Sequence, residues 1–191
     1  MIIIRKYGDL IGVHLILLDK MLPYNLKETY QITPNAEAAE FIQAEVQDYF
    51  GYEQKSKREK YADVWITKNE GINVKTDNLL SQQNKGRLCT AEVNQWLRDP
   101  SNNLKFLFIE YRNEDGLLTL VSTKEVYIEE VVYEICNQGR GLLQPKRNKE
   151  GKVILRDRIS RDEWMEEFKV KYSEFVGKQI ARFRKYESEW C

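Results

Sequence analysis

The chain has 191 residues, and its 30 Lys and Arg balance its 30 Asp and Glu, so its formal net charge is zero. A hydrophobic content of 42%, with 12% aromatic residues, is enough to build a packed core and excludes a disordered chain. The neutral balance is unlike that of a strongly basic nucleic-acid-binding protein, but it does not exclude DNA binding, which depends on how charge is distributed.

Cysteine and histidine content excludes several kinds of site. The single histidine, His14, excludes a multi-histidine zinc site. Cys89, Cys136 and Cys191 are too far apart for a C-x-x-C metal motif, and their odd number fits no closed disulfide framework, so we expect reduced thiols in a cytoplasmic protein. No stretch reaches the ~18 apolar residues of a membrane span, and the apolar start is too short for a signal peptide. We expect a single domain spanning residues 1–191.

The first predicted elements are an apolar segment and a helix. Residues 1–22 are apolar and predict a strand followed by either a strand or a helix. The segment Thr33–Asn35, with a capping residue and a proline, predicts the start of a helix that runs to about Phe50 and ends at Gly51.

Glu45 has an unusual place on this predicted helix. It falls in the middle of the apolar face, where a carboxylate needs a cation, a hydrogen-bonding network or a polar cavity. The alternative is that the helix rolls slightly and exposes Glu45 to solvent. The apolar face consists of Ala38, Phe41, Ile42, Val46 and Tyr49.

The stretch KYADVWITKNEGINVKT, residues 60–76, predicts two strands joined by a turn near Lys68 to Gly71. Asp63 lies in the first strand, at the open end of this hairpin. The stretch is either an ordinary surface hairpin or one that brings polar side chains together for metal-assisted chemistry.

The alternation of the second strand separates its side chains onto two faces. Residues two apart share a face, so Asn73 and Lys75 lie on one side while Ile72 and Val74 face the core. Lys75 and Asp63 both lie at the open end. The hairpin therefore predicts that Asp63, Asn73 and Lys75 converge on a small polar patch.

The middle of the chain predicts a polar segment, a short helix and a second hairpin. The polar segment is Asp77–Cys89, and Thr90 caps a helix that extends to about Trp96. Leu104–Arg112 predicts a strand that turns at Asn113–Gly116 and continues as the partner strand Leu117–Ser122.

The last third of the chain ends in a long helix. Ile128–Cys136 is either a helix or a strand, and Gly139–Lys152 is a glycine-rich basic loop. The capping box Ser160–Glu163 opens a helix that runs nearly to the C-terminus. Its apolar stripe either packs on the domain or lies partly in a dimer interface. The stripe contains Trp164, Phe168, Tyr172, Phe175, Val176, Ile180 and Phe183.

The predicted order is helix, hairpin, helix, hairpin, helix. This order indicates an α/β or α+β domain with a central mixed β-sheet flanked by helices.

Asp63, Asn73 and Lys75 are the residue types that metal-assisted phosphodiester hydrolysis requires. A carboxylate holds Mg²⁺, which prefers oxygen ligands, and a side-chain or backbone oxygen of Asn73 or Val74 completes the shell. A lysine beside the metal orients or activates the attacking water and stabilises the charge of the transition state. Glu45, one helix earlier, is a candidate ligand for the same metal or for a second one.

The segments YADVWI and GINVKT resemble the PD-(D/E)xK nuclease family, especially Type II restriction endonucleases. The resemblance implies a restriction-endonuclease-like fold and sequence-specific cleavage of double-stranded DNA. It also implies a Mg²⁺ cofactor, for which Mn²⁺ can substitute, and a homodimer matched to a palindromic site.

The family motif carries over to individual positions. Asp63 matches the metal-binding acid, Lys75 matches the catalytic lysine, and Glu45 stands where an upstream helix often supplies a glutamate. Two positions depart from the motif: Ala62 replaces its proline, and Asn73 stands at the second acid. An amide is a weaker, neutral ligand, so Asn73 weakens metal binding or marks an inactive domain.

Two polar segments supply candidate DNA contacts, because Arg and Lys suit guanine and phosphate while Asn and Gln suit adenine. The alternative is that both are solvated loops. The candidates are Gln82, Gln83, Asn84, Lys85 and Arg87 in the first segment, and Arg140, Gln144, Lys146 and Arg147 in the second.

Two other functions compete with restriction. One is a DNA repair or recombination nuclease of the same fold. The other is a non-catalytic nucleic-acid-binding or structural protein, in which Asp63 and Lys75 form an ordinary surface ion pair that contributes little stability.

Overall fold

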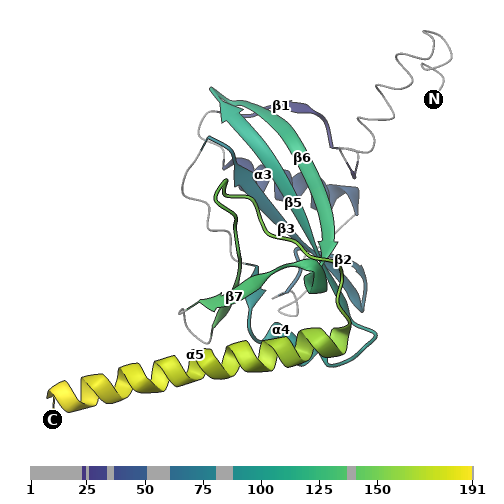
Figure 1. Ribbon diagram of the computed structural model, residues 1–191. Helices are drawn as coiled ribbons and strands as arrows, with labels where there is room; N and C mark the ends of the chain where they lie inside the picture. Colours follow the sequence, from purple (N-terminus) through teal and green to yellow (C-terminus); the bar gives the residue numbers. More distant parts are fainter. Residues whose placement is uncertain are drawn as a thin grey trace, which may run out of the picture.

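The computed structural model describes residues 23–24, 26–33, 37–50, 61–80, 88–136 and 141–190 (Figure 1). The expectations for residues 1–22, His14, Gly51 and Cys191 lie outside these ranges. The elements in chain order are β1 (Thr29–Gln31), α3 (Ala38–Tyr49), β2 (Val64–Thr67), β3 (Glu70–Asn78), β4 (Cys89–Thr90), α4 (Val93–Leu97), β5 (Asn103–Glu114), β6 (Leu117–Tyr127), η1 (Ile128–Glu130), β7 (Tyr133–Cys136), β8 (Leu142–Pro145) and α5 (Arg161–Trp190).

The main sheet has five strands in the order β1-β6-β5-β3-β2. Strands β3 and β5 are parallel, and the other neighbours are antiparallel, so the predicted central mixed sheet is confirmed. A parallel pair needs a long crossover connection, and here the chain between β3 and β5 contains β4 and α4.

The predicted second hairpin is confirmed as β5 and β6, and both strands are longer than their sequence patterns indicate. Its turn residues, Asp115 and Gly116, have φ angles of 51° and 83°. Two consecutive positive φ angles suit the tight hairpin turns whose twist matches that of the flanking strands.

Helix α3 covers one face of the main sheet. Its buried residues Ile42 and Val46 pack with Val64, Ile72 and Val74 of the β2–β3 hairpin. This contact confirms that Ile72 and Val74 face a hydrophobic core.

The start of α3 corrects the sequence prediction. The helix begins at Ala38, later than the predicted Thr33–Asn35, of which Thr33 is non-helical and 34–36 lie outside the described residues. Glu37 has an extended backbone (φ −72°, ψ 101°), so the helix does not continue on the N-terminal side of Ala38.

A second layer, which the sequence does not predict, covers the other face of the main sheet. It contains a small antiparallel sheet in the order β4-β8-β7, with α4 and α5 packed beside it. Thr90 is therefore a strand residue rather than a helix cap, and α4 begins after Glu92. The predicted loop Gly139–Lys152 contains β8, and Ile128–Cys136 divides into a 3₁₀ turn and β7.

Helix α5 begins with the predicted capping box: the Ser160 amide donates to Glu163 Oε2 (2.8 Å), and the Glu163 amide donates to Ser160 Oγ (3.2 Å). With 30 residues it is about 45 Å long, and its C-terminal half extends beyond the rest of the protein (Figure 1). No helix in the described part of the chain is long and apolar enough to cross a membrane.

The apolar stripe of α5 divides into two parts. Trp164, Phe168 and Phe175 are buried against the second layer, whereas Ile180 and Phe183 are 47% and 70% exposed. The first part of the stripe therefore packs on the domain. A dimer interface stays a prediction for the second part.

A buried ionic network fixes the start of α5. Glu129 is 1% exposed, and its Oε1 accepts a hydrogen bond of 2.6 Å from Arg161 Nε. Arg161 Nη1 also donates to the carbonyls of Leu97 and Asn102, both at 3.0 Å. The guanidinium thereby joins η1, α4 and the residue before β5 to the helix.

We expect Arg161→Ala to lower the free energy of unfolding by about 3–5 kcal/mol, because it leaves the Glu129 carboxylate buried with one cation fewer. Urea denaturation monitored by circular dichroism measures the change. Lys169→Ala is the matched control, since Lys169 pairs with Glu166 at the exposed surface and its loss should change stability by less than ~0.5 kcal/mol. An equal effect of the two substitutions would contradict a stabilising role for the network.

Candidate active site

The predicted β2–β3 hairpin is confirmed, with Val64 opposite Ile72 and Trp65 opposite Gly71. Asp63 directly precedes β2, and its amide donates to the Ile72 carbonyl at 2.8 Å. Strand β3 continues to Asn78, so Asp77 belongs to the strand and not to the predicted polar segment.

Two further hydrogen bonds hold Asp63 in place. Its Oδ2 accepts from the Val74 amide at 2.7 Å, and its carbonyl accepts from Gln47 Nε2 at 3.1 Å. Gln47 lies on α3, so the helix helps to position the hairpin. The sequence carried no signal that singled out this glutamine.

Asp63 and Lys75 interact electrostatically in a partly desolvated environment. Burial raises the pKa of the Asp63 carboxyl, although Lys75 and the Val74 amide act in the opposite direction. Burial lowers the pKa of the Lys75 ammonium, although Asp63 and Cys89 act in the opposite direction. Desolvation therefore outweighs the mutual attraction of the two groups, which is not the behaviour of an exposed ion pair.

Cys89 of β4 lies close enough to Lys75 for their charges to interact. Burial raises the pKa of the Cys89 thiol to about 12, with Lys75 opposing the shift. The thiol therefore stays protonated, and Cys89 is a free cysteine in the structure. Its place shows that the second layer covers the face of β3 that carries Lys75.

Asn73 is only 6% exposed, so the predicted polar patch is not an open surface. Its Nδ2 donates to the Tyr61 carbonyl at 2.9 Å. Its Oδ1 is buried without a hydrogen-bond partner in the described structure. The Asn73 amide thus has a structural role that a carboxylate cannot perform, and its oxygen is left unpaired.

Glu45 is half-buried on α3, and its charge acts on the hydroxyl of Tyr30 of β1. Burial raises the pKa of the Tyr30 hydroxyl, and Glu45 adds to this shift while the Lys27 amide opposes it. The structure therefore gathers Asp63, Val74 and Lys75 with Asn73, whereas Glu45 lies near Tyr30.

A divalent cation such as Mg²⁺ requires oxygen ligands that lie close together. In the described ranges, no three His, Cys, Asp or Glu side chains form a group that could hold a metal. Mg²⁺ is commonly held by one or two carboxylates and keeps several waters. The desolvated Asp63 carboxylate and the unpaired Asn73 Oδ1 fit such a sparse site.

Beyond Lys75, the same face of β3 carries Asp77, which lies opposite Glu110 of β5. Asp77 forms a salt bridge of 2.9 Å with Arg147 Nη2. Arg147, a candidate DNA contact, is therefore already occupied by a carboxylate. Asp77 and Glu110 border a depression of about 250 Å³ together with Lys124. The sequence could not reveal these pairings, because they join distant segments.

Most of the predicted DNA contacts lie outside the described residues. Gln144 is half-buried on β8, and Lys146 is exposed directly after it. Lys146 borders a depression of about 340 Å³ with Lys171 and Lys178 of α5. The candidates that lie outside the described residues are Gln82, Gln83, Asn84, Lys85, Arg87 and Arg140.

Comparison with known proteins adds one finding. No protein-family model matches the chain, and no curated protein matches it in sequence. Among solved structures, the chain is similar to the NlaIV restriction endonuclease, with a TM-score of 0.47 and 12% identity. The match covers 90% of this chain and 88% of that one.

We expect Asp63→Asn to raise the melting temperature at pH 7 in the absence of metal. A carboxyl whose pKa is raised by folding stabilises the folded state when protonated, and this contribution is lost as the pH rises through the folded-state pKa. Each kcal/mol gained raises Tm by about 2–4 °C in a chain of this size.

The same reasoning predicts that Tm of the variant and of the wild type converge below pH ~3.9, the ordinary pKa of Asp, where Asp63 is neutral. Calorimetry over a pH series checks both statements, with exposed Asp157→Asn as the matched control. A lower Tm for Asp63→Asn at pH 7 would show that desolvation of the carboxylate is not the dominant effect.

We expect Asn73→Asp to lower the stability of the metal-free protein at pH 7. The Tyr61 carbonyl would lose its donor and face a buried carboxylate oxygen, and a lost buried hydrogen bond costs about 1–3 kcal/mol. Urea denaturation with and without Mg²⁺ is the measurement, and added Mg²⁺ should recover part of the loss. Unchanged stability would mean that the Asn73 amide is not needed to satisfy Tyr61.

Proposed function

We propose that this chain is a Type II restriction endonuclease that hydrolyses phosphodiester bonds of double-stranded DNA at specific sequences with Mg²⁺. The supporting observation is that a desolvated Asp63, bonded to the Val74 amide, interacts with Lys75 in one hairpin. We propose that residues 1–191 act as one nuclease domain.

In this proposal Asp63 holds the metal, together with Asn73 Oδ1 and the Val74 backbone oxygen. When bound, Mg²⁺, or Mn²⁺ in its place, polarises the scissile phosphate and lowers the pKa of a coordinated water. The raised pKa of Asp63 means that its carboxylate becomes available for ligation only as the pH rises above that pKa. Glu45 stays a predicted additional ligand.

Lys75 acts on the water and on the charge of the reacting phosphate. Its lowered pKa increases the neutral fraction of Nζ at a given pH, so Nζ can accept a proton from the attacking water. The protonated form stabilises the negative charge that develops on the phosphate oxygens. Partial burial strengthens this interaction, because less water screens it.

Gln47 and Tyr61 are positioning residues. Gln47 holds the Asp63 backbone from α3, and the Tyr61 carbonyl holds the Asn73 amide. Neither group needs to touch the substrate.

We propose that DNA and a second copy of the chain are the partners. Gln144 and Lys146 are the described candidates for DNA contact. The exposed Ile180 and Phe183 support a homodimer through the distal part of α5, because neighbouring exposed apolar side chains mark protein interaction sites. A two-fold dimer would match a palindromic DNA site.

One observation favours a second candidate, a non-catalytic DNA-binding protein. Asn73 supplies a neutral amide where the family motif has an acid, and Nδ2 is used within the protein. A site with one fewer negative charge binds a divalent cation more weakly. Cleavage assays separate the two candidates.

We expect purified protein to cut plasmid or phage DNA into discrete fragments with Mg²⁺. Asp63→Ala and Lys75→Ala should each reduce the cleavage rate by about 10²–10⁴-fold, because one removes the metal-holding carboxylate and the other the proton acceptor. Gel electrophoresis of timed digests measures the rate, and exposed Asp157→Ala and Lys149→Ala are the matched controls.

The pattern of DNA fragments on the gel identifies the class of nuclease. Smears or structure-dependent nicks would instead support a repair or recombination nuclease. Absence of cleavage with either Mg²⁺ or Mn²⁺ would contradict the proposed activity, and full activity of either site variant would contradict the site assignment.

A further inference from the structure

Gly71 lies in β3, opposite Trp65 of β2, in the hairpin that follows Asp63. It is buried and does not have a positive φ angle, so its backbone conformation does not require glycine. The space around it does: a Cβ atom at this position would lie 2.5 Å from the Cβ of Ala62. Carbon atoms in contact are normally about 3.5–4.0 Å apart, so any side chain at position 71 displaces a neighbour.

The segment that leads to Asp63 crosses the face of β3 on which Gly71 lies. Gly71 and Asn73 share this face, because residues two apart in a strand point to the same side. Asn73 Nδ2 donates to the Tyr61 carbonyl at 2.9 Å, and the missing Cβ of Gly71 makes room for Ala62. The path of these two residues therefore decides where Asp63 enters the hairpin.

Ala62 has little freedom to move aside. It is 2% exposed and belongs to the hydrophobic core cluster of the second layer. Its Cβ is bonded directly to the backbone, so relief of a contact with it requires a shift of the backbone. Such a shift would pass to Asp63, whose Oδ2 lies 2.7 Å from the Val74 amide and whose own amide lies 2.8 Å from the Ile72 carbonyl.

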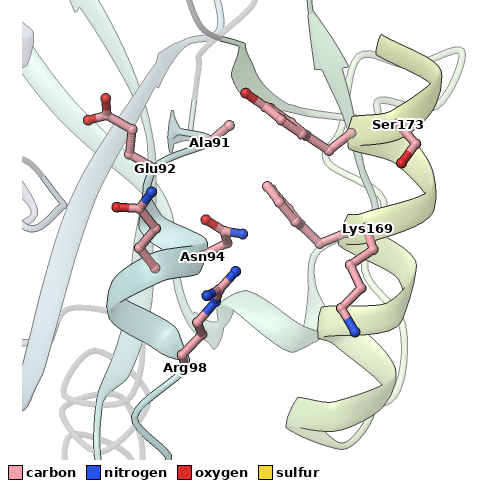
Figure 2. Close-up of a pocket in the computed structure, with 9 residues that line it drawn as sticks. Ala91, Glu92, Asn94, Arg98, Lys169 and Ser173 are labelled. Atoms are coloured by element: carbon pink, nitrogen blue, oxygen red, sulfur yellow. The ribbon is translucent and has the colours of Figure 1, made fainter. Parts of the chain in front are cut away.

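Contacts with α4 hold the chain on both sides of Asp63. The Tyr61 ring stacks on Trp96 of α4 with centroids 6.0 Å apart, and the Trp65 ring meets Trp96 at 90° with centroids 5.3 Å apart. The other side of α4 is open: Asn94, about 200° around the helix from Trp96, borders a depression of about 480 Å³ between α4 and α5 (Figure 2). The segment before Asp63 therefore cannot move away from β3 without breaking the packed side of α4.

We propose that Gly71 is a positioning residue of the candidate active site. The absence of a side chain lets the segment before Asp63 cross β3 closely enough to place the Asp63 carboxylate against the Val74 amide. Gly71 acts through Asp63 and does not need to contact metal or DNA. The inference rests on the proposed function for the reaction that Asp63 serves. A displacement of about 1 Å at a group that takes part in catalysis can reduce the rate about 10²-fold.

The first test is amide hydrogen exchange, measured by NMR in the metal-free protein. The Val74 amide donates to the Asp63 carboxylate, so its exchange rate reports the position of that group. We expect Gly71→Ala to accelerate exchange of the Val74 amide about tenfold more than that of the Leu120 amide, which donates to the Glu28 carbonyl. Equal acceleration of the two amides would show a general loss of stability and would overturn the positioning role.

A second substitution makes the test specific to the contact between positions 71 and 62. Ala62→Gly removes the Cβ that an alanine at position 71 would meet, and the next nearest atoms, in the Trp65 ring, are at an ordinary contact distance of 3.4 Å. In the double variant Gly71→Ala/Ala62→Gly, we expect the Val74 amide to exchange within about threefold of its rate in Ala62→Gly alone. If Gly71→Ala does not fold, recovery of the fold in the double variant supports the contact, and no recovery overturns it.

The second test measures cleavage of DNA with Mg²⁺. We expect Gly71→Ala to lower kcat about 10²-fold and to leave KM within about threefold, because the displaced carboxylate holds the metal and not the DNA. The double variant should recover kcat to within about tenfold of Ala62→Gly. Gly177→Ala is the matched control, since a Cβ there meets no atom within 4 Å, and it should leave kcat unchanged. A change in KM alone would overturn the positioning role.

The two tests separate this inference from the proposed function. If the protein does not cleave DNA but Gly71→Ala frees the Val74 amide and Ala62→Gly restores it, the nuclease activity is overturned and the placement of Asp63 by Gly71 is supported. If the protein cleaves DNA and Gly71→Ala is as active as the wild type, the positioning role alone is overturned.

Discussion

The burial of β3 on both faces is the constraint on which the rest of the structure depends. One face packs against α3 through Ile72 and Val74, and the other is covered by the second layer, where Cys89 lies near Lys75. Water is therefore partly excluded from Asp63, Asn73 and Lys75. The shifted pKa values of Asp63 and Lys75 follow from this exclusion rather than from the residue types alone, and so does the unpaired amide oxygen of Asn73.

Desolvated polar groups reduce stability, and other parts of the fold offset this cost. Two hydrophobic clusters pack against opposite faces of the main sheet, and the Glu129–Arg161 pair joins η1, α4 and the residue before β5 to α5. Asp77 and Arg147 provide a further tie between β3 and the second layer. In proteins generally, a functional site often contains groups that lower stability, while contacts elsewhere in the fold raise it.

Local signals in the sequence were sufficient for several elements. The alternation of residues 60–76 located the hairpin and assigned Ile72 and Val74 to the core, while Ser160 and Glu163 located the start of α5. The small second sheet was not recognised, because β4 and β8 are short and their strand character depends on pairing between distant segments. The start of α3 was placed too early, because Glu37 has an extended backbone that the residue pattern did not indicate.

The sequence by itself determined which side chains are close neighbours along one hairpin, because strand alternation places Asp63, Asn73 and Lys75 together whatever surrounds them. Only the tertiary structure decided their chemical environment. It placed Gln47 against Asp63, directed Glu45 to Tyr30, and formed the pocket between α4 and α5. The physical reason is that burial and long-range contacts depend on how distant segments pack, and a local residue pattern carries no record of that packing.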